Sequence, residues 1–136
     1  MDNSAPETLL SKTDADRIFS LTKPEWNQQA KEYVGSGWIV TSQHDTGAQV
    51  AMINPSTGTG LAVHPLFAND HEPPIMVIVS NHFPMGALPP MTDEAKRDIQ
   101  AAAQKNLGSD YQVKLQHAKL EHSEVIELIV TKRPDA

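Results

Sequence analysis

The sequence of 136 residues contains no cysteine, few aromatic residues and no long run of basic or apolar residues. Without cysteine the chain has no disulfide, no thiolate zinc site and no cysteine nucleophile. Aromatic residues make up only 5% of the chain, so aliphatic side chains must fill its core. The longest apolar run, over residues 75–79, is too short for a membrane-spanning helix.

Basic charge is also scarce, because the formal net charge is −6 and the longest basic run is the pair Lys132-Arg133. An acidic surface repels nucleic acid and anionic lipid, so we expect no nucleic-acid partner and no membrane partner. Residues 1–7 have neither the basic nor the apolar region of a secretory signal, and we therefore expect a cytoplasmic protein. No cofactor-binding motif is found, and we expect no cofactor.

The hydropathy pattern predicts one α+β domain over residues 12–133, preceded by a disordered tail over residues 1–11. We expect two short N-terminal helices, the first capped by Thr13 and the second beginning at Pro24. A longer helix is predicted over residues 92–107. A stripe of alanine and aliphatic residues on this helix is expected to face the sheet: Ala95, Ile99, Ala102, Ala103 and Leu107.

Alternating and β-branched segments predict five to six strands in a mostly antiparallel sheet, in the order αα-ββββ-α-ββ. Since the segment 75–79 has no polar alternation, we expect a central strand that is covered on both faces. Pro65 indicates that the third strand lies at an edge or ends there. The predicted strands cover residues 38–42, 49–53, 61–67, 75–79, 111–116 and 125–131.

The string Asp45-Thr46-Gly47-Ala48 resembles the active-site loop of retroviral-type aspartic proteases. In that family two copies of the loop meet in a dimer, and two carboxylates share a proton and activate water. The resemblance implies a dimeric aspartic-type hydrolase with Asp45 as the catalytic residue. This chain has polar residues at 42–44, where the family has apolar ones. The alternative is that Asp45 and Gly47 only form a hairpin turn, and we favour it.

The histidines of the chain form no recognised metal-binding motif, and we expect no metal site from the sequence. Histidines far apart in the sequence stay open as ligands of a site assembled by the fold. His82 follows the most hydrophobic strand, where a rigid strand gives way to a loop. This position raises a second enzymatic hypothesis, a small-molecule enzyme with a site near His82. The alternative, which we favour, is a histidine that bonds to nearby backbone.

Residues 83–91 contain no charge, although surface loops are usually polar. Either this segment packs on its own sheet, or it exposes Phe83, Met85, Leu88 and Met91 to a partner. We therefore expect a non-enzymatic protein-interaction domain, a homodimer or an adaptor, that uses these four residues, in preference to an enzyme. The order of elements is similar to that of small acidic secretion chaperones. Those proteins usually close with a C-terminal helix, which is not expected here.

Overall fold

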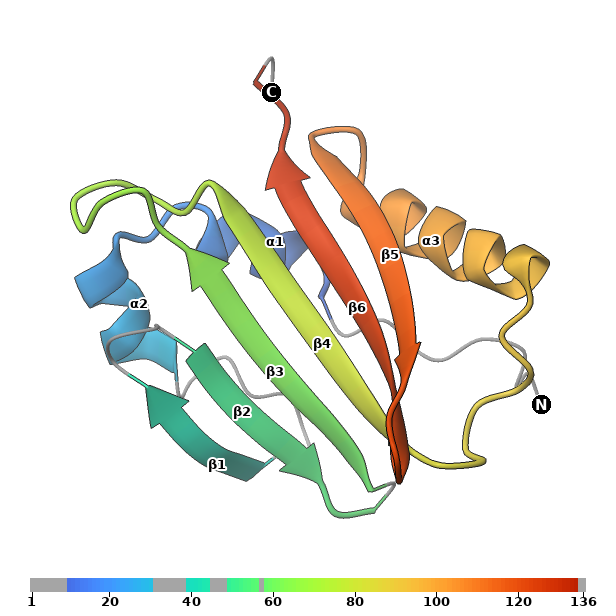
Figure 1. Cartoon of the computed structure of the whole chain (residues 1–136). Coiled ribbons are helices and arrows are strands. Elements are labelled where there is room, and N and C mark those ends of the chain that lie inside the picture. Colours follow the sequence, from blue (N-terminus) through green and yellow to red (C-terminus); the bar gives the residue numbers. More distant parts are fainter. Residues whose placement is uncertain (1–9, 31–38, 45–48, 57, 135–136) are drawn as a thin grey trace.

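The computed structural model describes residues 10–30, 39–44, 49–56 and 58–134. These residues form three helices and a six-stranded antiparallel sheet, which confirms the α+β prediction and its order of elements (Figure 1). The helices are α1 (Lys12–Ile18), α2 (Lys23–Gln29) and α3 (Asp93–Leu107). The strands are β1 (Ile39–His44), β2 (Gln49–Asn54), β3 (Thr59–Leu66), β4 (Met76–Pro84), β5 (Tyr111–Lys119) and β6 (Ser123–Lys132).

The strands are ordered β1-β2-β3-β4-β6-β5 across the sheet, and all neighbouring pairs are antiparallel. After β4 the chain passes through α3 and returns as the edge strand β5, so β6 lies between β4 and β5 (Figure 1). β3 is an internal strand, in which Pro65 lies opposite Val77 of β4. The edge position offered for β3 is therefore wrong. The strand end is confirmed, since β3 stops at the next residue, Leu66.

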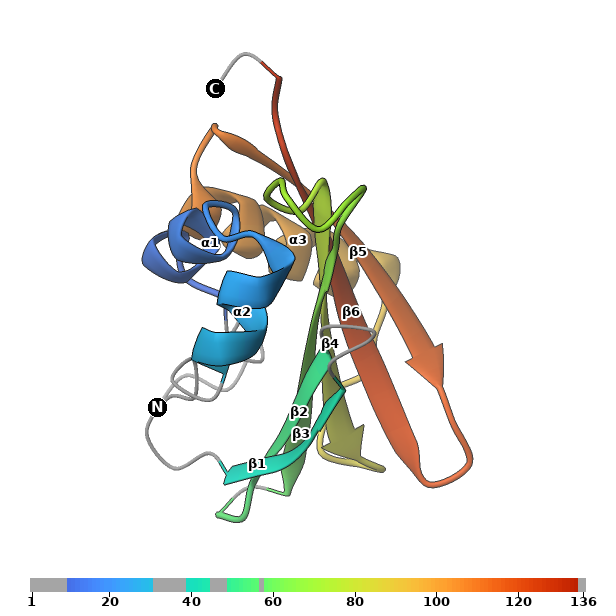
Figure 2. The same ribbon diagram turned by 90° about the vertical axis from the view of Figure 1, so that its left-hand side faces the viewer.

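One face of the sheet carries the hydrophobic core. Val63, Val79 and Leu128 lie side by side on β3, β4 and β6, and each is at most 1% exposed. The helices pack on this side, and Figure 2 shows α1 and α2 to the left of the sheet, which is seen nearly edge-on. Each helix contributes large or aliphatic side chains to the same core, including Ile18, Trp26 and Leu107.

The other face of the sheet is uncovered within the described chain. Along β4 the buried residues Val77 and Val79 alternate with half-buried residues such as Ile78. No helix of the described residues lies over the half-buried set (Figure 2). The expectation that residues 75–79 are covered on both faces is therefore wrong, because all three helices pack on the same side.

The first helix begins slightly earlier than predicted. Its N-cap is Ser11, whose hydroxyl oxygen accepts a hydrogen bond of 3.1 Å from the backbone N–H of Asp14. Thr13 lies inside the helix, so the predicted cap is wrong. Leu10 is only 1% exposed, so it belongs to the core and not to the predicted tail. Residues 1–9 of that tail lie outside the described residues.

The long helix α3 agrees closely with its prediction. Thr92 is its N-cap and accepts a hydrogen bond of 3.1 Å from the N–H of Ala95. The helix ends at Gly108, whose φ of 85° is open to glycine but strained for other residues. Ala102 is exposed, so it does not belong to the stripe that faces the core. The buried residues of α3 are Ile99, Ala103 and Leu107.

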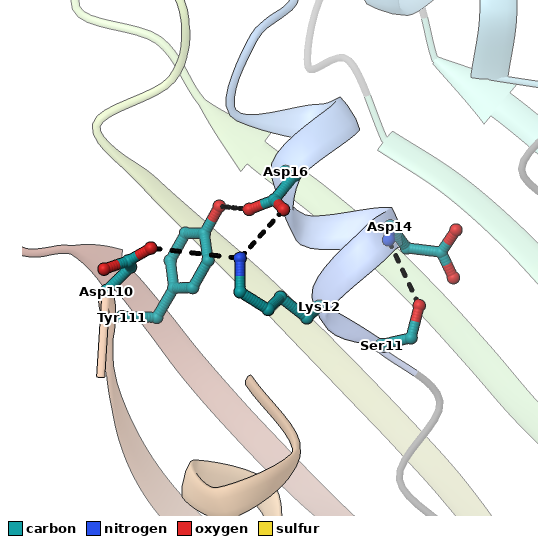
Figure 3. Close-up of polar contacts among 6 residues, drawn as sticks. All are labelled: Ser11, Lys12, Asp14, Asp16, Asp110 and Tyr111. Carbon is teal, nitrogen blue, oxygen red and sulfur yellow. Dashed lines mark hydrogen bonds and ion pairs between the residues drawn. The ribbon is translucent and has the colours of Figure 1, made fainter. Parts of the chain in front are cut away.

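A polar cluster joins α1 to the start of β5 (Figure 3). The Tyr111 hydroxyl donates a hydrogen bond of 2.6 Å to Asp16, and the Lys12 ammonium lies 3.0 Å from the same carboxylate. The Tyr111 hydrogen bond, helped by Lys12, holds the pKa of Asp16 below its ordinary value. Burial, together with the bond to Asp16, raises the pKa of Tyr111. The ring of Tyr111 also contacts Phe19, with centroids 5.2 Å apart, so this cluster fastens α1 to the sheet.

Within the described ranges, no helix is both long enough and apolar enough to cross a bilayer. The longest is α3, which has 15 residues and carries charged side chains along its length.

Candidate functional site

The loop that resembles an aspartic-protease active site, Asp45-Thr46-Gly47-Ala48, lies outside the described residues. Its flanking strands β1 and β2 pair in antiparallel fashion, with His44 opposite Gln49. The catalytic hypothesis for Asp45 stays a prediction.

His82 lies inside β4 rather than after it. The strand continues to Pro84 because β3 and β6 flank it on both sides, and His82 lies opposite Gly60 and Val125. Its side chain is exposed on the uncovered face of the sheet. The expected position at a strand end is therefore wrong, and His82 instead belongs to a flat surface.

The uncharged segment 83–91 is divided between a strand and an exposed turn. Phe83 and Pro84 are the last residues of β4, and Phe83 is half-buried opposite Glu124 of β6. Met85 is 49% exposed, and the following residues through 87 are also exposed. The segment is therefore not a closed lid on the core. The two other predicted interaction residues, Leu88 and Met91, are half-buried.

Three exposed apolar side chains lie at one end of the sheet, whereas Ile75, which is 63% exposed, lies at the other end, just before β4. The backbone N–H of Met85 donates a hydrogen bond of 3.3 Å to the carbonyl of His122, which brings the turn after β4 beside the β5–β6 turn. Leu120 in that turn is 49% exposed, and Ile53 near the end of β2 is 39% exposed. Both belong to the sheet end at which β2, β4 and β5 finish (Figure 1). We call Ile53, Met85 and Leu120 the apolar end.

The uncovered face carries aliphatic side chains across its centre. Ile78 of β4 lies opposite Ile129 of β6, and both are half-buried although no helix covers them in the described chain. One polar contact interrupts this band, a hydrogen bond of 3.2 Å from the Ser80 hydroxyl to the Glu127 carboxylate. The described members of the face on the inner strands are Ala51, Ile53, Ala62, His64, Leu66, Met76, Ile78, Ser80, His82, Val125, Glu127, Ile129 and Thr131.

A buried contact between a histidine and a glutamate on the covered side was not predicted. His117 of β5 and Glu124 of β6 have side chains 9% and 7% exposed, with 3.1 Å between His117 Nε2 and Glu124 Oε1. Asn81 lies one strand further in, opposite Ile126, and its buried Oδ1 has no hydrogen-bond partner among the described residues. Because these side chains are almost fully buried, they are poorly placed to meet a substrate. Because side chains alternate along a strand, His117 and Glu124 lie on the same face of the sheet. In the sequence alone, both have the polar character of ordinary surface residues.

Among the described residues, no group of three or more histidine and acidic side chains is arranged to hold a metal ion. No protein-family model, curated protein or solved structure matches this chain. We therefore infer function from the surface chemistry of the chain itself, in which the uncovered face and the apolar end are the most unusual features.

Proposed function

We propose that this protein is a protein-interaction domain that associates with a second copy of itself through the uncovered face of its sheet. The observation that supports this proposal is the aliphatic band around Ile78 and Ile129, which is half-exposed and has the same residue types as the packed face. Contiguous exposed apolar surface in water-facing proteins marks interfaces. The apolar end, with Met85, would extend the contact at one side.

The size of the face suits a dimer. Six strands about 4.8 Å apart make a sheet about 25 Å wide, and the longer strands extend for about 25–30 Å. Two such faces packed together would remove at least roughly 1,200 Å² from water, which reaches the range of specific protein–protein interfaces. Flat antiparallel sheets also stack naturally on one another, as in sandwich folds.

A second copy is favoured over an unrelated partner by the mixture of charges on this face. Glu127 lies near its centre, and Lys114 extends from the adjoining strand β5, opposite Ile129. A two-fold axis that passes between Glu127 and Lys114 would bring the carboxylate of each copy against the ammonium of the other, without a like-charge conflict. A symmetric contact between two copies therefore supplies complementary charges without a different partner protein.

Of the four interaction residues predicted from the sequence, one fits this proposal better than the other three. Met85 is the most exposed of the four, while Phe83, Leu88 and Met91 are half-buried supports of the turn that carries it. The cytoplasmic location expected from the sequence is part of the same proposal. An enzyme that uses Asp45 or His82 is the alternative, and it would require a second catalytic group beside either residue.

The proposal is tested by sedimentation equilibrium of the purified protein with and without Ile78→Lys. A lysine at this position leaves the covered core untouched but places an unpaired charge at the centre of the interface. We expect the wild type to be a dimer at micromolar concentration and the variant to dissociate at least about 100-fold more readily. Met85→Asp, at the margin, should weaken the dimer by about ten-fold.

The matched control is Ala102→Lys, which adds the same charge to the exposed side of α3. It should leave the association constant unchanged. A wild-type protein that stays monomeric at several hundred micromolar would contradict the proposal. So would an Ile78→Lys variant that is folded by circular dichroism and dimerises as well as the wild type.

A further inference from the structure

The outer edge of β5 is a second surface, distinct from the uncovered face. The N–H of Arg133 bonds to the carbonyl of Asp110 at 2.9 Å, and the N–H of Leu120 bonds to the carbonyl of Ser123 at 2.8 Å. These contacts show that the even-numbered residues of β5 direct their backbone groups toward β6. The odd-numbered residues therefore direct theirs away from the sheet.

Two glutamines of α3 take the place of a neighbouring strand along the first half of this edge. The Gln104 amide donates to the carbonyl of Tyr111 at 2.7 Å, and its oxygen accepts from the N–H of Val113 at 3.2 Å. The Gln100 oxygen accepts from the N–H of Leu115 at 3.0 Å. Four helix residues advance about 6 Å and two strand residues about 6.7 Å, so glutamines spaced by four match successive outward groups.

The match ends after Leu115. The next residue in the same helical row is Lys96, whose ammonium only donates and gives no acceptor to a backbone N–H. The outward N–H groups of His117 and Lys119 have no hydrogen-bond partner in the described chain. Figure 1 shows α3 diverging from β5 toward the N-terminus of the helix. The second half of the edge is therefore open to another strand.

A basic groove lies beside Leu115, where the protected part of the edge ends. Its volume is about 470 Å³, and among the described residues its charged lining consists of Lys96 and Arg97. Neither side chain forms an ion pair with another residue of the described chain. The complete lining consists of Lys96, Arg97, Gln100, Ala101, Gln104 and Leu115. This positive charge is unusual in a chain whose net charge is −6.

We propose that an extended, acidic segment of another protein adds to the sheet as a further strand beside residues 115–119 of β5, with its carboxylates against Lys96 and Arg97. Strand addition supplies acceptors for the outward N–H groups of His117 and Lys119. The free cations select an acidic segment over a basic one. This inference goes beyond the proposed dimer, and it uses the edge of the sheet rather than its face.

The test is a fluorescence-anisotropy titration of the full chain with a short synthetic peptide that alternates valine and glutamate. Two matched peptides carry lysine in place of glutamate, or N-methyl groups on alternate residues that block strand pairing. We expect the acidic peptide to bind at least about ten-fold more tightly than either. The double variant Lys96→Glu with Arg97→Glu should lose at least about ten-fold in affinity for the acidic peptide.

A second pair of variants separates strand pairing from charge. Lys119→Pro removes an outward N–H and a charge, whereas Lys119→Gln removes the charge alone. We expect the proline variant to bind at least about three-fold more weakly than the glutamine variant. Amide resonances of residues 115–119 should shift on binding in a two-dimensional NMR spectrum.

Several outcomes would overturn the strand-addition proposal. These are equal binding of the N-methylated peptide, no binding of the acidic peptide at millimolar concentration, or resonance shifts confined to the uncovered face. A Lys119→Pro variant that loses self-association would also overturn it, because a second copy would then occupy the edge. The outcome of the Ile78→Lys dimer test does not depend on whether the peptide binds, so the two proposals can fail separately.

Discussion

The two faces of the sheet are made of similar residues but have different environments. On β6, Leu128 and Val130 point into the core and are at most 1% exposed, whereas Ile129 between them is half-buried on the uncovered face. β4 repeats the contrast, with Val77 and Val79 buried and Ile78 half-buried. Half-buried aliphatic residues on a water-facing sheet surface gain only part of the free energy of burial in the monomer. This difference is what points to association through the uncovered face.

The edge of β5 shows a similar contrast on a smaller scale. Its first half is protected by Gln100 and Gln104, and its second half has outward N–H groups without partners in the described chain. Proteins usually protect the free edges of their sheets. Because only half of this edge is protected, we infer that the other half binds a partner strand.

The largest difference in stability between the two faces should come from truncating two neighbouring residues of β6 to alanine. Leu128→Ala leaves a cavity in the core and should lower the free energy of unfolding by about 2–5 kcal/mol. Ile129→Ala should cost about 1 kcal/mol or less in dilute solution, where the monomer predominates. Urea denaturation monitored by tryptophan fluorescence measures both. Equal losses would mean that the two faces are equally packed within one chain.

The next largest loss of stability should come from substitutions that expose the protected half of the β5 edge. Gln104→Ala leaves the carbonyl of Tyr111 and the N–H of Val113 without their partner, which should cost about 1–3 kcal/mol. Gln100→Ala removes a single contact and should cost about 1 kcal/mol or less. Denaturant unfolding compares the two variants. Glutamine variants as stable as the wild type would show that α3 does not protect the edge.

Hydrogen exchange sharpens the same contrast without any substitution. The amides of Val113 and Leu115 should exchange at least about ten-fold more slowly than those of His117 and Lys119 in the isolated monomer. Exchange followed by NMR measures these rates residue by residue. Uniform protection along β5 would remove the distinction between the two halves of its edge.

The smallest expected effect concerns the cluster that fastens α1 to β5. The pKa of Asp16 is held below its ordinary value of 3.8 by the Tyr111 hydroxyl and by Lys12, so its ionised form stabilises the fold above that pH. This contribution is lost as the pH falls through the lower pKa of the folded state. The stability advantage of the wild type over Asp16→Asn should therefore shrink below pH 3.8.

Thermal unfolding at a series of pH values measures this advantage, with Asp98→Asn on the exposed side of α3 as the matched control. A constant difference between the wild type and Asp16→Asn at all pH values would show that the carboxylate charge contributes nothing to the link with Tyr111.

The sequence predicts the elements of this fold well because local signals mark them. Thr92 and Gly108 delimit α3, and the alternation from Tyr111 onward marks β5. The extension of β4 through His82 is not predictable from its polar residues, because pairing with β3 and β6 decides it. The sequence also does not reveal which face of the sheet the helices cover, because Ile78 and Val79 lie on opposite faces and are both apolar.

The candidate surfaces were predictable only in part. The uncharged character of segment 83–91 leaves open whether the segment is packed or exposed, and Met85 lies in an exposed turn. The role of Gln100 and Gln104 was missed, although their spacing of four beside the apolar stripe is a usable signal. The pairing of His117 with Glu124 depends on the register of the last hairpin. Neither residue type nor local spacing reveals that register.

The most direct measurement of the central claim is an isotope-filtered NOE experiment on a mixture of labelled and unlabelled protein. Signals in this experiment arise only between protons of different copies. Association through the uncovered face predicts intermolecular contacts from the methyl groups of Ile78 and Ile129. Intermolecular contacts that arise only from other methyl groups, or none at concentrations where the protein is fully folded, would contradict the account.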